Sequence, residues 1–230
     1  MEMSEVDRMV EKVKIDDWQR KNQYKFFSVF TNPYASVTSI INVDKLVNYA
    51  KSNNISFYGL MSFEVLKAIN SIEEFKYVLD NDGVYKYDKI NITFSVLKTD
   101  NKLNFSRTVE FTKFTDFMEK FILAKQEAES DLQVPYTKEN NKIYVTCTPW
   151  MRITSIGNPM NYTKIDSIPR ICWGKYFLTD DGYNIDLSIQ VNHAFQDGYH
   201  LGLFLNTLQQ NIYNLGANKN EKRYTLHRSR

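Results

Sequence analysis

The stretch at residues 189–201, I-Q-V-N-H-A-F-Q-D-G-Y-H-L, combines side chains that could perform acid–base chemistry near neutral pH. The chain has three histidines, and two of them, His193 and His200, lie here. A neutral imidazole can accept a proton near pH 7 if neighbouring groups hold one tautomer and orientation. Asp197 could help directly, or by pairing with a cation that braces the loop. The pattern H-x-x-x-D-G leaves a second interpretation open, in which His193 is structural and Asp197 is a helix N-cap.

Other chemistries find less support in the same residues. His193, Asp197 and His200 could bind a metal ion, but no H-E-x-x-H or comparable spacing favours a metal site. Cys147 or Cys172 could be a nucleophile activated by a histidine, yet nothing local marks either thiol as activated. The chain has no G-x-S-x-G, P-loop or G-x-G-x-x-G motif, which disfavours serine hydrolases, NTPases and dinucleotide enzymes.

Composition narrows the class of protein further. With 29 basic and 27 acidic residues the formal charge is +2, so no nucleic-acid partner is expected. Two cysteines make no disulfide framework, and the polar N-terminus M-E-M-S-E-V-D-R is unlike a signal peptide. No apolar run approaches the ~20 residues of a membrane span. We therefore expect a cytoplasmic protein without a membrane partner.

The sequence predicts one domain over residues 1–215 and a basic, flexible C-terminal tail over 216–230, because no repeat or linker divides the chain. Strand and helix patterns interleave with few strict β-α-β units, which predicts a mixed β-sheet covered by helices. The expected strands are 35–42, 90–97, 103–109, 142–148, 170–178 and 185–193, with a hairpin at 76–88 around N-D-G. The expected helices are 16–27, capped by Asp16 or Asp17, then 44–53, 58–70, 113–130 and 198–215.

Strand geometry separates two neighbouring residues of the opening stretch. Successive strand side chains point to opposite faces, so Asn192 and His193 cannot both face one pocket. His193 falls at the end of the predicted strand 185–193, and Gly198 permits the turn into the last helix. One histidine, rather than two adjacent polar side chains, is therefore expected at the site.

Several segments of the chain, taken in order, resemble the motifs of one enzyme family. The run N-H-A-F-Q-D-G-Y-H-L-G-L-F-L-N-T-L-Q-Q resembles the C-terminal signature of the type A chloramphenicol acetyltransferases, H-H-A-V-C-D-G-F-H followed by a helix ending in N-x-L-Q. Further segments resemble that family in the same order: D-D-W-Q-R-K, N-I-S-F-Y-G-L-M-S-F-E-V-L-K-A-I-N, E-E-F-K-Y with N-D-G, T-C-T-P-W and W-G-K-Y. The resemblance covers roughly residues 10–215. Each motif is modest, but the ordered set is specific.

This resemblance implies a fold and a reaction. The fold is the two-layer α/β sandwich of CoA-dependent acyltransferases, assembled as a homotrimer with active sites at subunit interfaces. The reaction is O-acetylation of chloramphenicol, an antibiotic inactivation. Acetyl-CoA, a cosubstrate rather than a bound cofactor, donates its acetyl group through a tetrahedral intermediate without a covalent acyl-enzyme.

The resemblance also implies catalytic roles. His193 aligns with the general base that deprotonates the acceptor hydroxyl. Asp197 aligns with an aspartate whose family partner is an early arginine, matched by Arg20, and the pair would brace the loop that holds His193. Thr146 aligns with a serine that donates to the oxyanion, and threonine keeps that hydroxyl. His200 is then expected to be a structural partner within the last helix.

Binding roles follow in the same way. Lys175 of W-G-K-Y matches a lysine near the CoA channel, where a cation suits a phosphate. Phe26 and Phe27 match an aromatic stretch of the acceptor pocket, and Phe105 is aligned more loosely with it. Cys172 stands where the family has a threonine that helps to hold an active-site water.

Three departures from the family pattern bear on the acceptor. Asn192 replaces the first histidine of H-H, Cys172 replaces the threonine, and Phe27 replaces a tyrosine. The base and its brace are intact, so these changes affect the acceptor pocket more than the reaction. Two alternatives therefore stay open: a related acyltransferase with another hydroxylated acceptor, and a non-catalytic trimeric homologue that binds CoA or another ligand.

Overall fold

The computed structural model describes residues 10–80, 82–130 and 139–216, so the predicted basic tail lies outside the described residues beyond Gly216. The elements in chain order are β1 (Val10–Lys12), η2 (Ile15–Asp17), α1 (Lys21–Phe27), β2 (Tyr34–Asn42), α2 (Asp44–Asn53), α3 (Phe57–Asn70), η3 (Glu73–Lys76), β3 (Tyr77–Asp80), β4 (Gly83–Tyr87), β5 (Asn91–Leu97), β6 (Leu103–Phe105), α4 (Phe114–Glu129), β7 (Lys142–Thr148), β8 (Arg170–Gly174), β9 (Phe177–Thr179), β10 (Gly182–Asn192) and α5 (Gly198–Tyr213).

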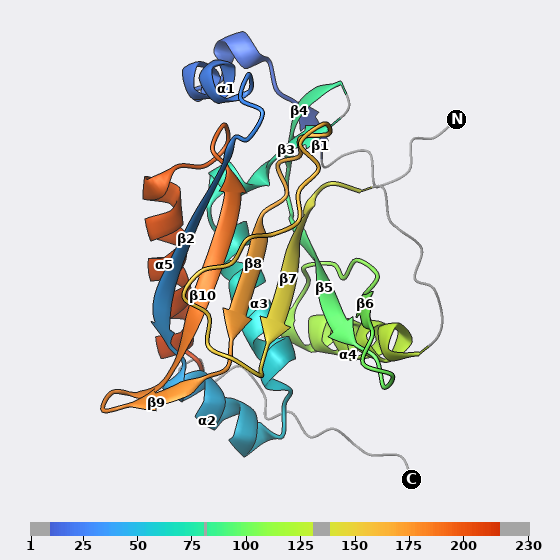
Figure 1. Ribbon diagram of the computed structural model, residues 1–230, viewed down its shortest axis with the longest axis vertical. Helices are drawn as coiled ribbons and strands as arrows, with labels where there is room; N and C mark the ends of the chain where they lie inside the picture. Colours follow the sequence, from blue (N-terminus) through green and yellow to red (C-terminus); the bar gives the residue numbers. More distant parts are fainter. Residues whose placement is uncertain (1–9, 81, 131–138, 217–230) are drawn as a thin grey trace.

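A seven-stranded sheet forms the centre of the molecule. Its strand order is β2-β10-β8-β7-β5-β6, and β9 pairs with β10. Strands β5, β7 and β8 run parallel, whereas β10 is antiparallel to both β2 and β8. The predicted mixed sheet is therefore confirmed. Because β10 runs against β7 and β8, its carboxyl end lies at the opposite edge of the sheet from theirs (Figure 1).

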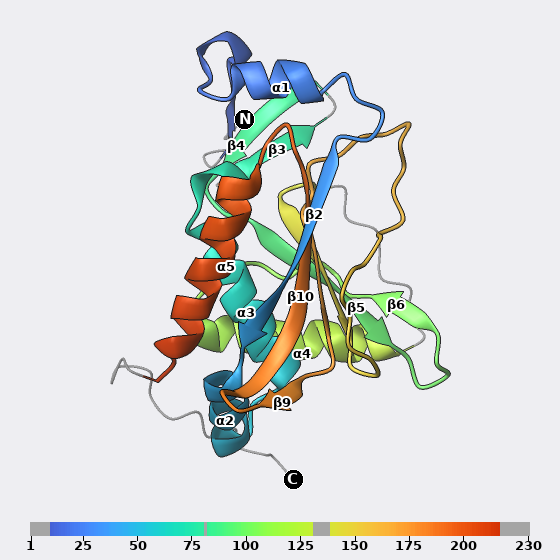
Figure 2. The same ribbon diagram turned by 60° about the vertical axis from the view of Figure 1, so that its left-hand side comes forward.

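Helices α3, α4 and α5 cover one face of this sheet (Figures 1 and 2). Alternate strand residues point to this face, because the side-chain period of a strand is two. The apolar core between the layers includes Trp173, Ile189, Phe94, Leu60 and Phe204, all fully buried. The same alternation of side chains along β10 places its apolar residues in this core and Asn192 on the opposite face from His193.

The other face of the sheet is polar and is crossed by the segment between β7 and β8 (Figure 1). Arg152 of this segment donates two hydrogen bonds to the buried carboxylate of Asp186 on β10, at 2.9 and 3.1 Å. Further along, Asn158 donates to Gln190 on the same strand at 3.0 Å. The polar face is therefore partly covered by a segment that is hydrogen-bonded along β10.

A second, three-stranded sheet of order β1-β4-β3 was not predicted. The β3–β4 hairpin itself was predicted from N-D-G, and Gly83 adopts a φ of 148° there, which favours glycine. Between this sheet and the end of β10 lies a small apolar cluster that contains Trp18, Val84 and Phe195. The cluster supports the loop that follows β10.

Three predicted elements differ from the structure. The predicted strand 103–109 ends at Phe105 as β6. The predicted helix 16–27 begins at Lys21, and in the described chain neither Asp16 nor Asp17 caps it, because the chain turns at η2 to bury Trp18. The predicted strand 170–178 is interrupted after Gly174, where an added Cβ would lie 2.6 Å from the Met151 carbonyl oxygen. Among the described residues, no helix is long and apolar enough to cross a membrane.

Candidate active site

His193 lies directly after β10, the strand whose carboxyl end is at the top of Figure 1. Its backbone N–H donates to the Pro33 carbonyl at 2.8 Å. Its imidazole stacks on the ring of Phe27 from α1, with centroids 4.2 Å apart and an interplanar angle of 13°. The Nδ1 atom is buried and has no hydrogen-bond partner among the described residues. Among the described contacts, ring stacking on Phe27 therefore orients this imidazole, and no hydrogen bond holds its Nδ1.

Asp197 combines the two functions that the sequence left as alternatives. One oxygen, Oδ2, accepts a bond from Arg20 Nη1 at 3.1 Å. The other, Oδ1, accepts the backbone N–H of Tyr199 at 3.1 Å and so caps α5. The described residues show no hydrogen bond between Asp197 and His193. The carboxylate therefore ties the loop after β10 to the segment before α1 and does not touch the candidate base.

The electrostatics of this pair favour the charged carboxylate. Burial acts to raise the pKa of Asp197, but the Arg20 hydrogen bond and the nearby positive charges outweigh it, so the pKa lies below its usual value. The Arg20 side chain is 11% exposed and that of Asp197 is 33% exposed. In a pair that is largely removed from water, desolvation offsets much of the attraction, but removal of one partner is costly because it leaves the other charge buried and unpaired.

His200 has a structural place in this network. Its Nδ1 accepts the backbone N–H of Asp197 at 3.2 Å, which completes a capping box at the start of α5. Its Nε2 lies 3.5 Å from Glu74 Oε1 on η3. The second histidine of the opening stretch is thus used to fix the helix start.

Asn192 supports the turn from the other side. Its side chain donates to the Asp166 carbonyl at 3.0 Å and accepts the backbone N–H of Ala194 at 3.0 Å. Both bonds are made on the polar face of the sheet, away from the imidazole of His193. The residue that breaks the H-H pattern therefore holds the backbone of the loop.

Thr146 lies far from His193 within one chain. It pairs in register with Cys172, which in turn pairs with Ser188 on β10. Ser188 precedes His193 by five strand steps of about 3.4 Å, and two strand spacings of about 4.8 Å separate β7 from β10. The two residues are therefore roughly 20 Å apart in one chain.

The predicted site residues fall into two groups. The base group lies around the end of β10 and comprises His193, Asp197, Arg20, Phe26 and Phe27. The strand group lies near the carboxyl ends of β7 and β8 and comprises Thr146, Cys172, Phe105 and Lys175. In the strand group, Phe105 on β6 pairs with Ser95 on β5. Phe94 pairs with Val145, so the next residues of these two strands, Ser95 and Thr146, lie beside each other. Phe105 is therefore separated from Thr146 by strand β5. The exposed Lys175 follows β8 directly.

Sequence reasoning missed one aromatic member of the base group. Phe30 contacts both Phe26 and Phe27, with ring centroids 5.2 and 5.5 Å apart. Its spacing of three and four residues from those two would place it on their face of a helix, which was an available signal. The three rings form a partly exposed apolar surface beside His193.

The sequence left two other chemistries open, one through the thiols and one through a metal ion. Burial raises the pKa of Cys147 to about 12 and that of Cys172 to about 11, so neither thiol forms an appreciable thiolate near neutral pH. In the described part of the chain, no group of three or more His, Cys, Asp or Glu side chains could hold a metal ion.

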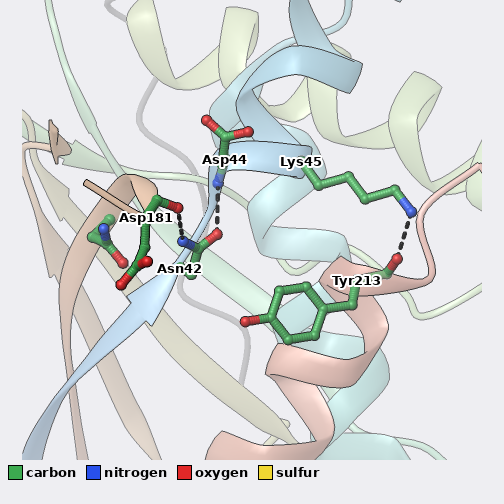
Figure 3. Close-up of a pocket in the computed structure, with 6 residues that line it drawn as sticks. Asn42, Asp44, Lys45, Asp181 and Tyr213 are labelled. Carbon is green, nitrogen blue, oxygen red and sulfur yellow. Dashed lines mark hydrogen bonds between the residues drawn. The ribbon is translucent and has the colours of Figure 1, made fainter. Parts of the chain in front are cut away.

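A polar pocket of about 440 Å³ is lined in part by Tyr213, the last residue of α5, whereas Asp197 caps the first turn of that helix. Figure 3 shows the side chains that line it. Its lining groups bond to one another: Asn42 donates to the Asp181 carbonyl and accepts from the backbone of Asp44, and Lys45 donates to the Tyr213 carbonyl. The pocket belongs to neither group of predicted site residues.

Comparison with known proteins identifies the family. The family model described as chloramphenicol acetyltransferase matches residues 9–209. A chloramphenicol acetyltransferase of Staphylococcus aureus is 29% identical over 207 residues, which covers 86% of this chain and 94% of the relative. That of Clostridium perfringens is 27% identical over 202 residues, with 86% and 92% covered.

Solved structures agree with this assignment. A chloramphenicol acetyltransferase structure superposes with a TM-score of 0.81 at 27% identity, covering 89% of this chain and all of that one. A probable dihydrolipoamide acetyltransferase from Listeria monocytogenes shares the fold alone, with a TM-score of 0.64 at 14% identity over 88% and 93% of the two chains. The chain therefore belongs to the chloramphenicol acetyltransferase family, which has the CoA-dependent acyltransferase fold and uses acetyl-CoA as cosubstrate.

Proposed function

We propose that this protein transfers the acetyl group of acetyl-CoA to a hydroxyl of chloramphenicol and thereby confers resistance in the cytoplasm. The observation that carries the proposal is the arrangement around His193. An imidazole at a strand end is oriented by Phe27, and its loop is tied down by a largely buried Asp197–Arg20 pair. General-base catalysis requires such a fixed imidazole.

In the proposed mechanism, His193 Nε2 removes the proton from the acceptor hydroxyl as its oxygen attacks the thioester carbonyl. The resulting tetrahedral oxyanion accepts a hydrogen bond from the Thr146 hydroxyl. When the intermediate collapses, the C–S bond breaks and the departing CoA sulfur takes the proton from the imidazolium. Asp197 and Arg20 keep the loop in place and transfer no proton.

The distance between His193 and Thr146 supports a site shared by subunits. A base must lie about 2.6–3.2 Å from the hydroxyl, and an oxyanion donor about 2.7–3.1 Å from the oxygen that forms. Two groups roughly 20 Å apart along one sheet cannot both do so. We therefore propose a homotrimer in which His193 of one subunit faces Thr146 of the next.

The proposed binding residues suit a flat apolar acceptor and a CoA phosphate. Phe26, Phe27 and Phe105 supply ring surface, and Lys175 supplies a cation near Thr146. Cys172 is buried beside Thr146 and stays protonated, so it offers a small, weakly polar wall. Phe27 lacks a hydroxyl, so another hydroxylated acceptor is the second candidate.

The test is chloramphenicol-dependent release of CoA by the purified full-length protein. Wild type should turn over, whereas His193→Ala should fall to background and the matched change His227→Ala should not. Turnover with other alcohols but not with chloramphenicol would assign a different acceptor. Binding of CoA without turnover on any alcohol would indicate a non-catalytic homologue and contradict the proposal.

A further inference from the structure

Gln196 has a specific contact that the mechanism above does not use. It lies in the loop between β10 and α5, fully buried, and its Nε2 donates to the backbone carbonyl of Glu74 at 2.7 Å. Its own backbone N–H donates back to Asn192 at 3.2 Å, which closes the turn that contains His193. The amide thus links the loop of the candidate base to η3.

The segment η3, whose Glu74 carbonyl accepts this hydrogen bond, is packed against the core. Phe75, the residue after Glu74, is buried and packs against Phe204 of α5, with centroids 6.1 Å apart. The carboxylate of Glu74 also approaches His200 Nε2, at 3.5 Å. A side chain bonded to this backbone is therefore held by the core layer of the molecule.

The Gln196 amide is poorly suited to stabilising the fold. Its Oε1 is buried and has no hydrogen-bond partner among the described residues, and the same is true of Arg20 Nε and Nη2. A buried amide with one group unpartnered contributes little net stability, because the desolvation cost of the orphan oxygen offsets the bond that the donor makes. The contact is therefore better explained by the position that it gives the loop.

We propose that Gln196 is a positioning residue for His193, in that its amide fixes the loop after β10 against η3. The inference rests on the proposed function. Asp197 and Gln196 then hold the loop against two different segments, one before α1 and one after α3.

The test compares two matched substitutions in the full-length protein. Gln196→Met keeps the length of the side chain and removes the donor. Gln209→Met is the control, because Gln209 lies on α5 and exchanges two hydrogen bonds with the Asn42 backbone at 2.9 and 3.0 Å, far from His193. Measured quantities are kcat and KM for acetyl-CoA and chloramphenicol, the Tm, and the imidazole NMR signals of histidine-labelled protein.

We expect Gln196→Met to lower kcat by about tenfold to a hundredfold, the scale that an ångström of misplacement produces, with each KM within about twofold. Its Tm should lie close to that of wild type, because removal of the unpartnered Oε1 offsets the loss of the bond to the Glu74 carbonyl, and the His193 signals should move. Gln209→Met should leave kcat and the His193 signals unchanged. Unchanged kcat in Gln196→Met, or a loss that follows a fall in Tm, would overturn the inference. If wild type has no turnover, the proposed function fails, and the His193 NMR signals alone then show whether Gln196 positions the imidazole.

Discussion

Removal of the Asp197 carboxylate is the perturbation with the most closely defined consequences. Asp197→Ala removes the bond to Arg20 and the cap on α5. A hydrogen bond to a charged group contributes about 1.5–3 kcal/mol, and an N-cap about 1 kcal/mol. Because Arg20 is almost buried and would lose its charged partner, we expect a loss of about 3 kcal/mol in the free energy of unfolding.

Asp197→Asn separates these contributions. Asparagine is as good an N-cap as aspartate, so the bond to the Tyr199 backbone can persist while the charge is lost. We expect a loss of about 2 kcal/mol, and Arg20→Ala should give a similar value. In both, kcat should fall by about tenfold to a hundredfold because the loop that carries His193 is released.

The assay is urea denaturation at pH 7 and fixed protomer concentration, since assembly changes apparent stability. A double-mutant cycle of Arg20→Ala and Asp197→Ala isolates the coupling between the two side chains. A coupling energy near zero, or wild-type kcat in Asp197→Asn, would refute the interpretation of the pair as a brace.

Three further predictions follow from the same structure. Thr146→Val should lower kcat by about 10²–10³-fold with little change in Tm, whereas Thr146→Ser should stay near wild type. Cys147 and Cys172, whose pKa values are raised to about 12 and 11, should react with a thiol reagent at pH 8 only after unfolding, which a timed colour reaction measures. The pKa of Asp197 is lowered in the fold, so its pairing stabilises the folded protein above the unfolded pKa near 3.9, and this stabilisation is lost as pH falls through the folded pKa. The difference in the free energy of unfolding between wild type and Asp197→Asn should therefore be constant from about pH 5 to 8 and shrink at lower pH.

Much of the fold could be predicted from local patterns. The helix predicted from Asp44 to Asn53, with Leu46, Val47 and Ala50 on one face, is observed as α2, and the strand predicted at 142–148 is observed as β7. These segments could be predicted because their apolar residues recur with a single helix or strand period along the whole segment. The helix expected at 16–27 was wrong at its start because burial of Trp18 and the pairing of Arg20 with Asp197 depend on residues far away in the sequence.

The sequence singles out candidate site residues and, through the family resemblance, a site between subunits, but it does not give the distances between those residues. Family motifs singled out His193 and Thr146, but nothing in either motif indicates that strand direction separates them within one chain. Gln196 and Glu74 carried no signal, because the contact between a side chain and a distant backbone carbonyl leaves no periodic pattern. The roles of the site residues stay predictions until they are measured.

The most direct test of the account is complementation between inactive subunits. His193→Ala and Thr146→Val proteins are unfolded together, mixed in equal amounts and refolded, and chloramphenicol acetylation is measured. If His193 and Thr146 of different chains form one site, about a quarter of the sites regain both groups, and activity should rise to about a quarter of wild type. If activity stays at the level of the separately refolded variants, both groups act within one chain and the proposed shared site is wrong.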